Sequence, residues 1–181
     1  MNKIHPTALV DPCAILGEDN TIGPYTIITS GCIIGNNNYI GPHCIIGEQP
    51  EKIGVTTNKR VRIGNNNTFY KQVTIDGGEN RETLIGNNNH FLKNSHVGHD
   101  CVIKDNVRLS CNAVVGGYTY IGDNSIFGIN ATCHQRSFIR PGTFIGGNAF
   151  FKGVSKMYYI YAGVPAKPIK FNKWAWDKYE L

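Results

Sequence analysis

Residues 91–127 read FLKNSHVGHDCVIKDNVRLSCNAVVGGYTYIGDNSIF, and a bulky apolar residue returns in this stretch at every sixth position. Neither a lone helix nor an alternating strand has this period. The period extends beyond the stretch in both directions, with two interruptions. We call its 24 members the guide residues: Ile4, Val10, Leu16, Ile22, Ile28, Ile34, Ile40, Ile46, Ile63, Phe69, Ile75, Ile85, Phe91, Val97, Ile103, Leu109, Val115, Ile121, Phe127, Cys133, Ile139, Ile145, Phe151 and Met157.

This fixed short period predicts a solenoid, in which each repeat buries its apolar face only by stacking on its neighbours. A six-residue unit suits a short strand followed by a corner, so three units would make one triangular coil with the guide residues inside. The position four residues after each guide residue is mostly small, and GNNN recurs at 35–38, 64–67 and 86–89. Gly and Asn tolerate corner conformations best. We therefore predict an all-β parallel β-helix of about eight coils over residues 1–157.

Two polar breaks interrupt the period, near 48–62 and 76–84. Insertions in a solenoid project from its corners as loops, often on the functional face. After Met157 the pattern decays into YYIYAGVPAKPIK and FNKWAWDKYEL. Residues 158–181 are therefore predicted to form a closing segment and a short helical cap over the open end of the stack.

The composition limits the class of protein. The 181 residues fit one domain, and a net charge of +5 is too dilute to indicate nucleic-acid binding. The six cysteines form no CxxC pair, and most fall at interior positions, which predicts reduced core residues. The N-terminus does not resemble a secretion signal, and no apolar run is long enough for a membrane span. We therefore expect a cytoplasmic protein.

Residues whose side chains could take part in catalysis are concentrated in NSHVGHDC, residues 94–101. Guide residue Val97 points inward, so we expect His99 on the outer surface near a corner. Gly117 follows eighteen residues later, one coil away or about 4.8 Å by strand spacing, and His134 is expected two coils away. An imidazole beside an accessible backbone N–H suits a general base with an oxyanion donor.

These residues carry a resemblance to a known family. The chain resembles the left-handed β-helix hexapeptide acyltransferases, above all the UDP-N-acetylglucosamine acyltransferases of lipid A synthesis and the N-acyltransferases of nucleotide-linked amino sugars. The resemblance rests on the IHPTA opening, the IGP and IGE turns, NSHVGHDC, the Gly116–Gly117 pair and CHQ at 133–135. It implies left-handed coiling, acyl transfer from a thioester to a nucleotide sugar, and a homotrimer with active sites between neighbouring subunits.

The resemblance also implies roles for individual residues. His99 corresponds to the general base of the family, and Gly117 to the backbone N–H that stabilises the oxyanion. The segment AGVPAKPIK, residues 162–170, resembles the part of coenzyme A-dependent members that lies along the cofactor. The residues expected to bind substrate are Glu51, His96, Tyr118, His134 and Gln135, and those expected to bind coenzyme A are Gly163, Lys167 and Lys170.

Two departures from the lipid A enzymes influence the expected substrates. Tyr118 stands where those enzymes have a His, and only about ten residues follow the last β-like segment, where those enzymes have a helical domain. The sequence therefore favours N-acetylation of a nucleotide-linked amino sugar, with acetyl-CoA as acyl donor. The alternative is O-acylation of UDP-N-acetylglucosamine by a 3-hydroxyacyl-acyl carrier protein.

A zinc hydratase resembling the γ-class carbonic anhydrases is a weaker alternative. Such an enzyme needs three His ligands around zinc. The spacings His90-x5-His96 and His96-x2-His99 do not resemble its ligand pattern. We therefore expect no metal.

Overall fold

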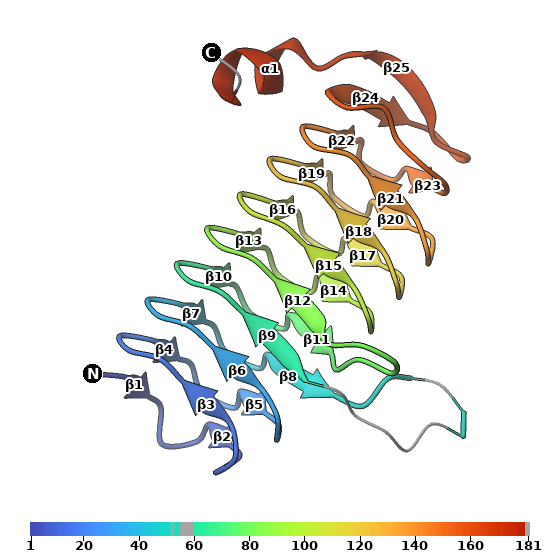
Figure 1. Cartoon of the computed structure of the whole chain (residues 1–181). Coiled ribbons are helices and arrows are strands. Elements are labelled where there is room, and N and C mark those ends of the chain that lie inside the picture. The colour runs from blue at the N-terminus through green and yellow to red at the C-terminus, as the bar shows by residue number, and fades with distance from the viewer. Residues whose placement is uncertain (52, 55–59, 180–181) are drawn as a thin grey trace.

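The computed structural model describes residues 1–51, 53–54 and 60–179, and shows a triangular stack of parallel β coils (Figure 1). Across this described part of the chain, three sheets form the sides of the stack, and successive strands pass from one sheet to the next. The all-β solenoid of about eight coils predicted from the six-residue period is confirmed. Part of the loop predicted near 48–62, and the last two residues of the predicted cap, lie outside the described residues.

The strands are mostly two residues long, as a six-residue unit requires. The ten-stranded sheet contains, in order, β1 (Lys3–Ile4), β4 (Thr21–Ile22), β7 (Tyr39–Ile40), β10 (Thr68–Phe69), β13 (His90–Phe91), β16 (Arg108–Leu109), β19 (Ile126–Phe127), β22 (Phe144–Ile145), β24 (Tyr159–Ala162) and β25 (Lys167–Phe171). The eight-stranded sheet contains β2 (Leu9–Val10), β5 (Ile27–Ile28), β8 (Ile45–Glu48), β11 (Thr74–Asp76), β14 (His96–Val97), β17 (Val114–Val115), β20 (Thr132–Cys133) and β23 (Phe150–Phe151). The seven-stranded sheet contains β3 (Ile15–Leu16), β6 (Ile33–Ile34), β9 (Val61–Ile63), β12 (Thr83–Ile85), β15 (Val102–Ile103), β18 (Tyr120–Ile121) and β21 (Phe138–Ile139).

The pairing register locates the two loops. Regular coils pair residues 18 positions apart, such as His96 with Val114. Tyr39 pairs with Thr68, 29 positions on, so the first loop adds 11 residues to its coil. Thr74 pairs with His96, 22 positions on, so the second loop adds 4 residues. Both insertions are absorbed outside the strands, which keeps the guide residues in register.

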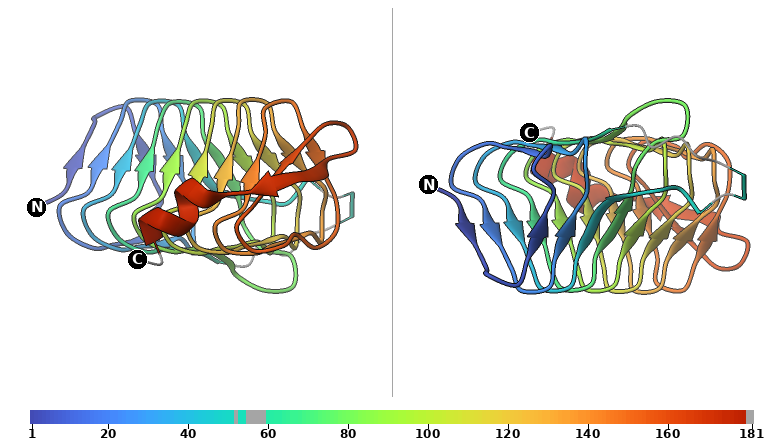
Figure 2. Two further views of the ribbon diagram at one scale, coloured as in Figure 1. Left: turned by 90° about the horizontal axis from the view of Figure 1, so that it is seen from above. Right: turned by 90° about the horizontal axis from the view of Figure 1, so that it is seen from below.

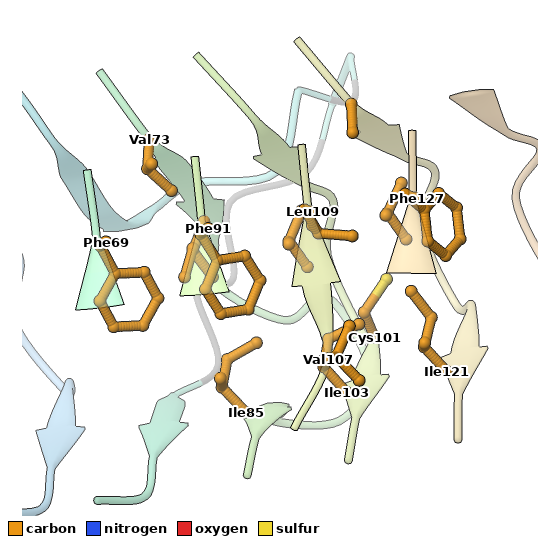
Figure 3. Packing of buried hydrophobic residues seen from close by; sticks show 14 of the residues in the cluster. Phe69, Val73, Ile85, Phe91, Cys101, Ile103, Val107, Leu109, Ile121 and Phe127 are labelled. Carbon is orange, nitrogen blue, oxygen red and sulfur yellow. The ribbon is translucent and has the colours of Figure 1, made fainter. Parts of the chain in front are cut away.

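The guide residues fill the interior from Ile22 to Phe151, where each is at most 4% exposed. The rings of Phe69 and Phe91 stack on one another in adjacent coils, with centroids 4.9 Å apart (Figure 3). At the open N-terminal end Ile4 is 45% exposed, because no coil precedes it. The prediction that Met157 also faces the interior is wrong: its side chain is 46% exposed.

The corners depend on backbone conformations with positive φ. At the corner that follows the ten-stranded sheet, four asparagines occupy this left-handed position in successive coils. Their side-chain amides form a ladder with N–O distances of 3.0 Å between neighbours. Asn adopts this conformation more readily than most residues do. The four asparagines are Asn94, Asn112, Asn130 and Asn148.

The chain closes the stack with a hairpin followed by a helix. Strand β24 pairs with β22 in parallel, and β25 pairs with β24 in antiparallel orientation. The helix α1 (Lys173–Tyr179) then turns back along the side of the stack (Figure 2). There Trp174 and Lys178 line a groove together with His90 and Arg108 of the ten-stranded sheet. A short C-terminal helix is therefore confirmed, but the hairpin is the element that pairs with the edge of the last coil.

All six cysteines are free, and Cys32, Cys44, Cys101 and Cys133 are buried in the core, as predicted. Within the described residues, no helix has the length and apolar character needed to cross a membrane.

Candidate functional site

Both loops and the end of the NSHVGHDC motif, residues 98–101, lie at one corner, where the chain passes from the eight-stranded to the seven-stranded sheet. The first loop joins β8 to β9, and the second joins β11 to β12. The described ends of the first loop and the whole second loop lie at the same edge of the stack (Figure 1). Turns of the next three coils, at 98–101, 116–119 and 134–137, continue this edge. We call these turns and the two loops the loop corner.

His99 and Gly117 meet at the loop corner, as the 18-residue spacing predicts. A Cβ atom added to Gly117 would lie only 2.7 Å from Nε2 of His99. Glycine is therefore what allows the imidazole to lie directly against the backbone of the next coil. The His99 side chain is only 17% exposed, so it is more enclosed than the outward position predicted.

The backbone N–H of Gly117 is available to a ligand. The N–H groups on either side are occupied: Gly116 donates to the Cys133 carbonyl and Tyr118 donates to the His99 carbonyl, both at 2.9 Å. The N–H of Gly117 has no acceptor among the residues that the structure describes. Buried backbone N–H groups rarely lack a partner, and this one adjoins the imidazole of His99.

Asp100 orients the imidazole. Its Oδ2 lies 2.8 Å from Nδ1 of His99. Its carboxylate also accepts backbone N–H groups of the second loop, from residues 79, 80 and 81, at 2.7, 2.9 and 2.7 Å. Burial alone would raise the pKa of Asp100, but the hydrogen bonds from the loop backbone and from His99 together outweigh it and lower the pKa. A carboxylate at Nδ1 favours the tautomer with its proton there and a free lone pair on Nε2.

Asp100 is a site residue that the sequence analysis missed. It lies inside NSHVGHDC, directly after His99, and an acidic residue adjacent to a candidate base could have indicated it. Its role depends on the loop at 77–82 folding back over it, however, and the six-residue period does not describe that loop.

A second group of titratable residues lies on the adjacent strands. Nδ1 of His96 lies 2.8 Å from Oγ1 of Thr74, and its Nε2 lies 3.7 Å from Oδ2 of Asp76. Burial lowers the pKa of His96, although the charge of Glu51 opposes this effect. Burial raises the pKa of Asp76 to about 7, and the charge of Glu51 raises it further while that of His99 lowers it.

The charges of Glu51 and His99 thus both act on His96 and Asp76, while the substrate-binding roles expected of Glu51 and His96 remain predictions. The structure adds Asp76, which the sequence analysis also missed. Asp76 is the first residue of the second polar break and directly follows guide residue Ile75. The register shift of β11 against β8 occurs between these two residues.

The raised pKa of Asp76 predicts a stability change in Asp76→Asn. An aspartate has a pKa near 3.9 in the unfolded chain, so between about pH 4 and 7 the folded state binds more protons. Stability contributed by protonated Asp76 is complete below the unfolded pKa and is lost as pH rises through the folded pKa. Asn cannot ionise, so we expect the Tm difference, variant minus wild type, to rise by a few degrees between about pH 5 and pH 8. Parallel Tm–pH curves for the two proteins would contradict the assignment.

The other predicted substrate residues lie along the same corner. The Tyr118 ring meets the His99 imidazole edge-on, with centroids 5.1 Å apart. Nδ1 of His134 lies 2.9 Å from the backbone carbonyl of Gln135. The side chain of Gln135 is exposed. His90, in contrast, lies on the ten-stranded sheet, away from this corner.

The residues predicted to bind coenzyme A lie on the closing hairpin. Gly163 occupies its turn with φ of +94°, and its carbonyl accepts the N–H of Phe150 at 3.1 Å. The turn therefore adjoins β23. This strand pairs with β20, and His134 directly follows β20. Lys167 and Lys170 are exposed on β25.

Within the described part of the chain, Glu79, His99 and Asp100 form a group whose potential metal-ligand atoms lie within 4.8 Å of one another. Asp100 already accepts the loop N–H groups, and its Oδ2 lies at hydrogen-bond distance from Nδ1 of His99. The expectation of no metal remains a prediction.

Comparisons with known proteins identify the family to which this chain belongs. The bacterial transferase hexapeptide family (six repeats) matches residues 2–48 and 82–117. An acyl-[acyl-carrier-protein]–UDP-N-acetylglucosamine O-acyltransferase of Burkholderia orbicola is 33% identical over 214 aligned residues, covering 95% of this chain and 74% of that protein. Its counterpart in Stutzerimonas stutzeri is 35% identical over 195 residues, with coverages of 95% and 75%.

Solved structures agree. LpxA from Acinetobacter baumannii superimposes with a TM-score of 0.89 at 29% identity, covering 97% of this chain and 76% of that one. The UDP-N-acetylglucosamine acyltransferase from Campylobacter jejuni gives a TM-score of 0.81 at 27% identity, with coverages of 98% and 78%. The solenoid is accordingly of the left-handed type. The chain therefore belongs to the hexapeptide-repeat acyltransferases, in the family of the acyl-[acyl-carrier-protein]–UDP-N-acetylglucosamine O-acyltransferases.

Proposed function

We propose that the protein transfers an acyl group from an acyl-[acyl-carrier-protein] to a hydroxyl of UDP-N-acetylglucosamine. This is the alternative that the sequence analysis left open, and the relatives' activity supports it better than the N-acetylation that the sequence favoured. The observation that carries the proposal is the imidazole of His99 beside the free N–H of Gly117, with Asp100 behind it.

Each of these groups has a chemical task in the proposed reaction. Nε2 of His99 takes the proton of the sugar hydroxyl as its oxygen attacks the thioester carbon. Asp100 stabilises the imidazolium that forms, and the N–H of Gly117 donates to the carbonyl oxygen as it becomes an oxyanion. The tetrahedral intermediate then collapses, the carbon–sulfur bond breaks, and the leaving thiolate takes the proton from His99.

N-acylation of a nucleotide-linked amino sugar is a second candidate, favoured by one observation. The carboxyl groups of Glu51 and Asp76 both interact with the site around His96 and His99. A carboxylate attracts an ammonium group more strongly than a hydroxyl, and the charge of Glu51 acts on both His96 and Asp76. In this case acetyl-CoA is the donor, with Gly163, Lys167 and Lys170 along the coenzyme.

A mass-spectrometric assay separates the two candidates. Purified protein is incubated with acetyl-CoA or with 3-hydroxyacyl-acyl carrier proteins of several chain lengths, each with UDP-N-acetylglucosamine or a panel of nucleotide amino sugars. We expect an alkali-labile ester with the carrier protein and UDP-N-acetylglucosamine. Formation of an alkali-stable amide, with acetyl-CoA alone as donor, would overturn the O-acylation proposal.

We propose that the chain forms a homotrimer in the cytoplasm, with sites between subunits. The outer sheet faces carry exposed apolar side chains that a neighbour could cover, including Leu9 at 66% and Ile15 at 60%. The subunit mass is 20.0 kDa, so light scattering should give about 60 kDa, as expected for closed threefold symmetry. Only monomer at micromolar concentration would contradict the trimer.

A further inference from the structure

Three successive coils place a left-handed residue at the same point of the loop corner. These residues are Asp100, Tyr118 and Arg136, with φ of 60°, 59° and 61°. Asp adopts positive φ comparatively well, but Tyr and Arg do so at a cost on the order of 1–3 kcal/mol each. Positive φ recurs at corners throughout the stack, so the solenoid itself imposes this conformation on Tyr118 and Arg136. This raises the question of what the side chains of Tyr118 and Arg136 do.

The Tyr118 ring holds two guanidinium groups beside the proposed base. Cζ of Arg136 lies 4.6 Å from the ring centroid, and Cζ of Arg81, from the second loop, lies 5.9 Å from it. The imidazole of His99 meets the same ring at 5.1 Å. Arginine side chains stack on aromatic faces in this way while their N–H groups remain free to bind a ligand.

Both guanidinium groups lack an anionic partner within the described residues. Arg81 donates from Nε to the backbone carbonyl of Asp100 at 2.9 Å, and no ion pair with a carboxylate involves Arg81 or Arg136 in that part of the chain. Both side chains are exposed. The carboxylate of Glu79 is close by, but it accepts a hydrogen bond from the Tyr118 hydroxyl at 3.0 Å. That hydroxyl also accepts a hydrogen bond from the Asn80 side chain, so two residues of the second loop hold the outer end of the ring that supports the two cations.

We propose that Arg81 and Arg136, supported by Tyr118, bind a substrate phosphate at the entrance to the His99 site. A planar guanidinium group binds phosphate oxygens with paired hydrogen bonds. This inference rests on the proposed function, in which the nucleotide sugar carries a diphosphate and the carrier-bound donor carries a phosphodiester at the far end of its arm. The phosphate is either the diphosphate of the nucleotide sugar or the phosphodiester of the carrier's pantetheine arm.

Binding measurements on the 181-residue chain distinguish these sources without requiring turnover. Isothermal titration calorimetry compares UDP with uridine, and 4′-phosphopantetheine with pantetheine. The proteins are wild type, Arg81→Gln, Arg136→Gln and the double variant, with Arg108→Gln on the ten-stranded sheet as the matched control. We expect the double variant to bind one phosphate-bearing ligand at least about tenfold more weakly, with no change for its phosphate-free counterpart. Weaker binding of UDP would show that the two arginines bind the phosphate of the acceptor. Weaker binding of 4′-phosphopantetheine would show that they bind the phosphate of the donor.

Kinetics give a second readout. The KM of the assigned substrate should rise in Arg136→Gln while kcat changes little, and Arg136→Lys should recover part of the loss because it keeps the charge. Unchanged affinity for both phosphate-bearing ligands in the double variant overturns the inference. A different result would overturn the proposed function instead. In that case the arginine variants lose phosphate binding, but the wild-type protein shows no acyl transfer.

Discussion

His99→Ala is expected to lower turnover by about 10² to 10⁴-fold, the usual contribution of a general base. The reason is geometric. Nε2 of His99 faces Gly117, its Nδ1 is bound to Asp100, and the variant removes the group that would take the proton of the acceptor. The measurement is single-turnover formation of the acylated sugar nucleotide, which separates chemistry from product release.

Two controls accompany this variant. His90→Ala removes an imidazole from the ten-stranded sheet and should leave turnover near the wild-type value. Trimer mass and substrate affinity should be unchanged in His99→Ala, because the side chain contributes little to the core. Near-normal turnover by His99→Ala with the hydroxyl acceptor would show that His99 only positions the substrate. With an amine acceptor that binds neutral, a weaker dependence on His99 is expected.

The sequence predicts the solenoid because every level of its pattern agrees. The guide residues set the coil, the small neighbouring positions fit beside them, and Gly and Asn suit the corners. The same arithmetic places Gly117 against His99, since 18 residues make one coil. It fails for Met157, because after Phe151 the chain leaves the coil and forms the closing hairpin instead.

The parts of the site that escape sequence analysis depend on the inserted loops. Asp100 and Asp76 are ordinary acidic residues in the sequence, and their environment arises from the second loop and from its junction with β11. Three backbone N–H groups converge on Asp100 only after the loop has folded, and the pKa of Asp76 is raised mainly because burial removes water around it. Neither effect follows from a six-residue period, because both involve residues that the period excludes.

Gly117→Ala is expected to reduce turnover by about 10²-fold or more, because displacing a catalytic group by about 1 Å can cost that much. The added Cβ would lie 2.7, 2.9 and 3.0 Å from Nε2, Cε1 and Cδ2 of His99. Real Cβ atoms essentially never approach other atoms within 3.0 Å, so the imidazole must move. It cannot move freely, because its Nδ1 is bound to the fully buried carboxylate of Asp100. Movement of the imidazole therefore either breaks its hydrogen bond to Asp100 or displaces Nε2 from the acceptor hydroxyl.

A double-mutant cycle tests whether the effect of Gly117→Ala acts through the imidazole. In His99→Ala the ring is absent, so the added methyl group meets no clash and the double variant should turn over about as slowly as His99→Ala alone. Such strong non-additivity is expected of groups that act as one unit. Fully additive losses of turnover would instead show that Gly117→Ala acts through the Gly117 N–H. The contact between His99 and Gly117 would then not contribute to catalysis. Circular dichroism and trimer mass of Gly117→Ala should match wild type, since the site lies at a corner outside the packed interior and the methyl group displaces a side chain rather than a strand.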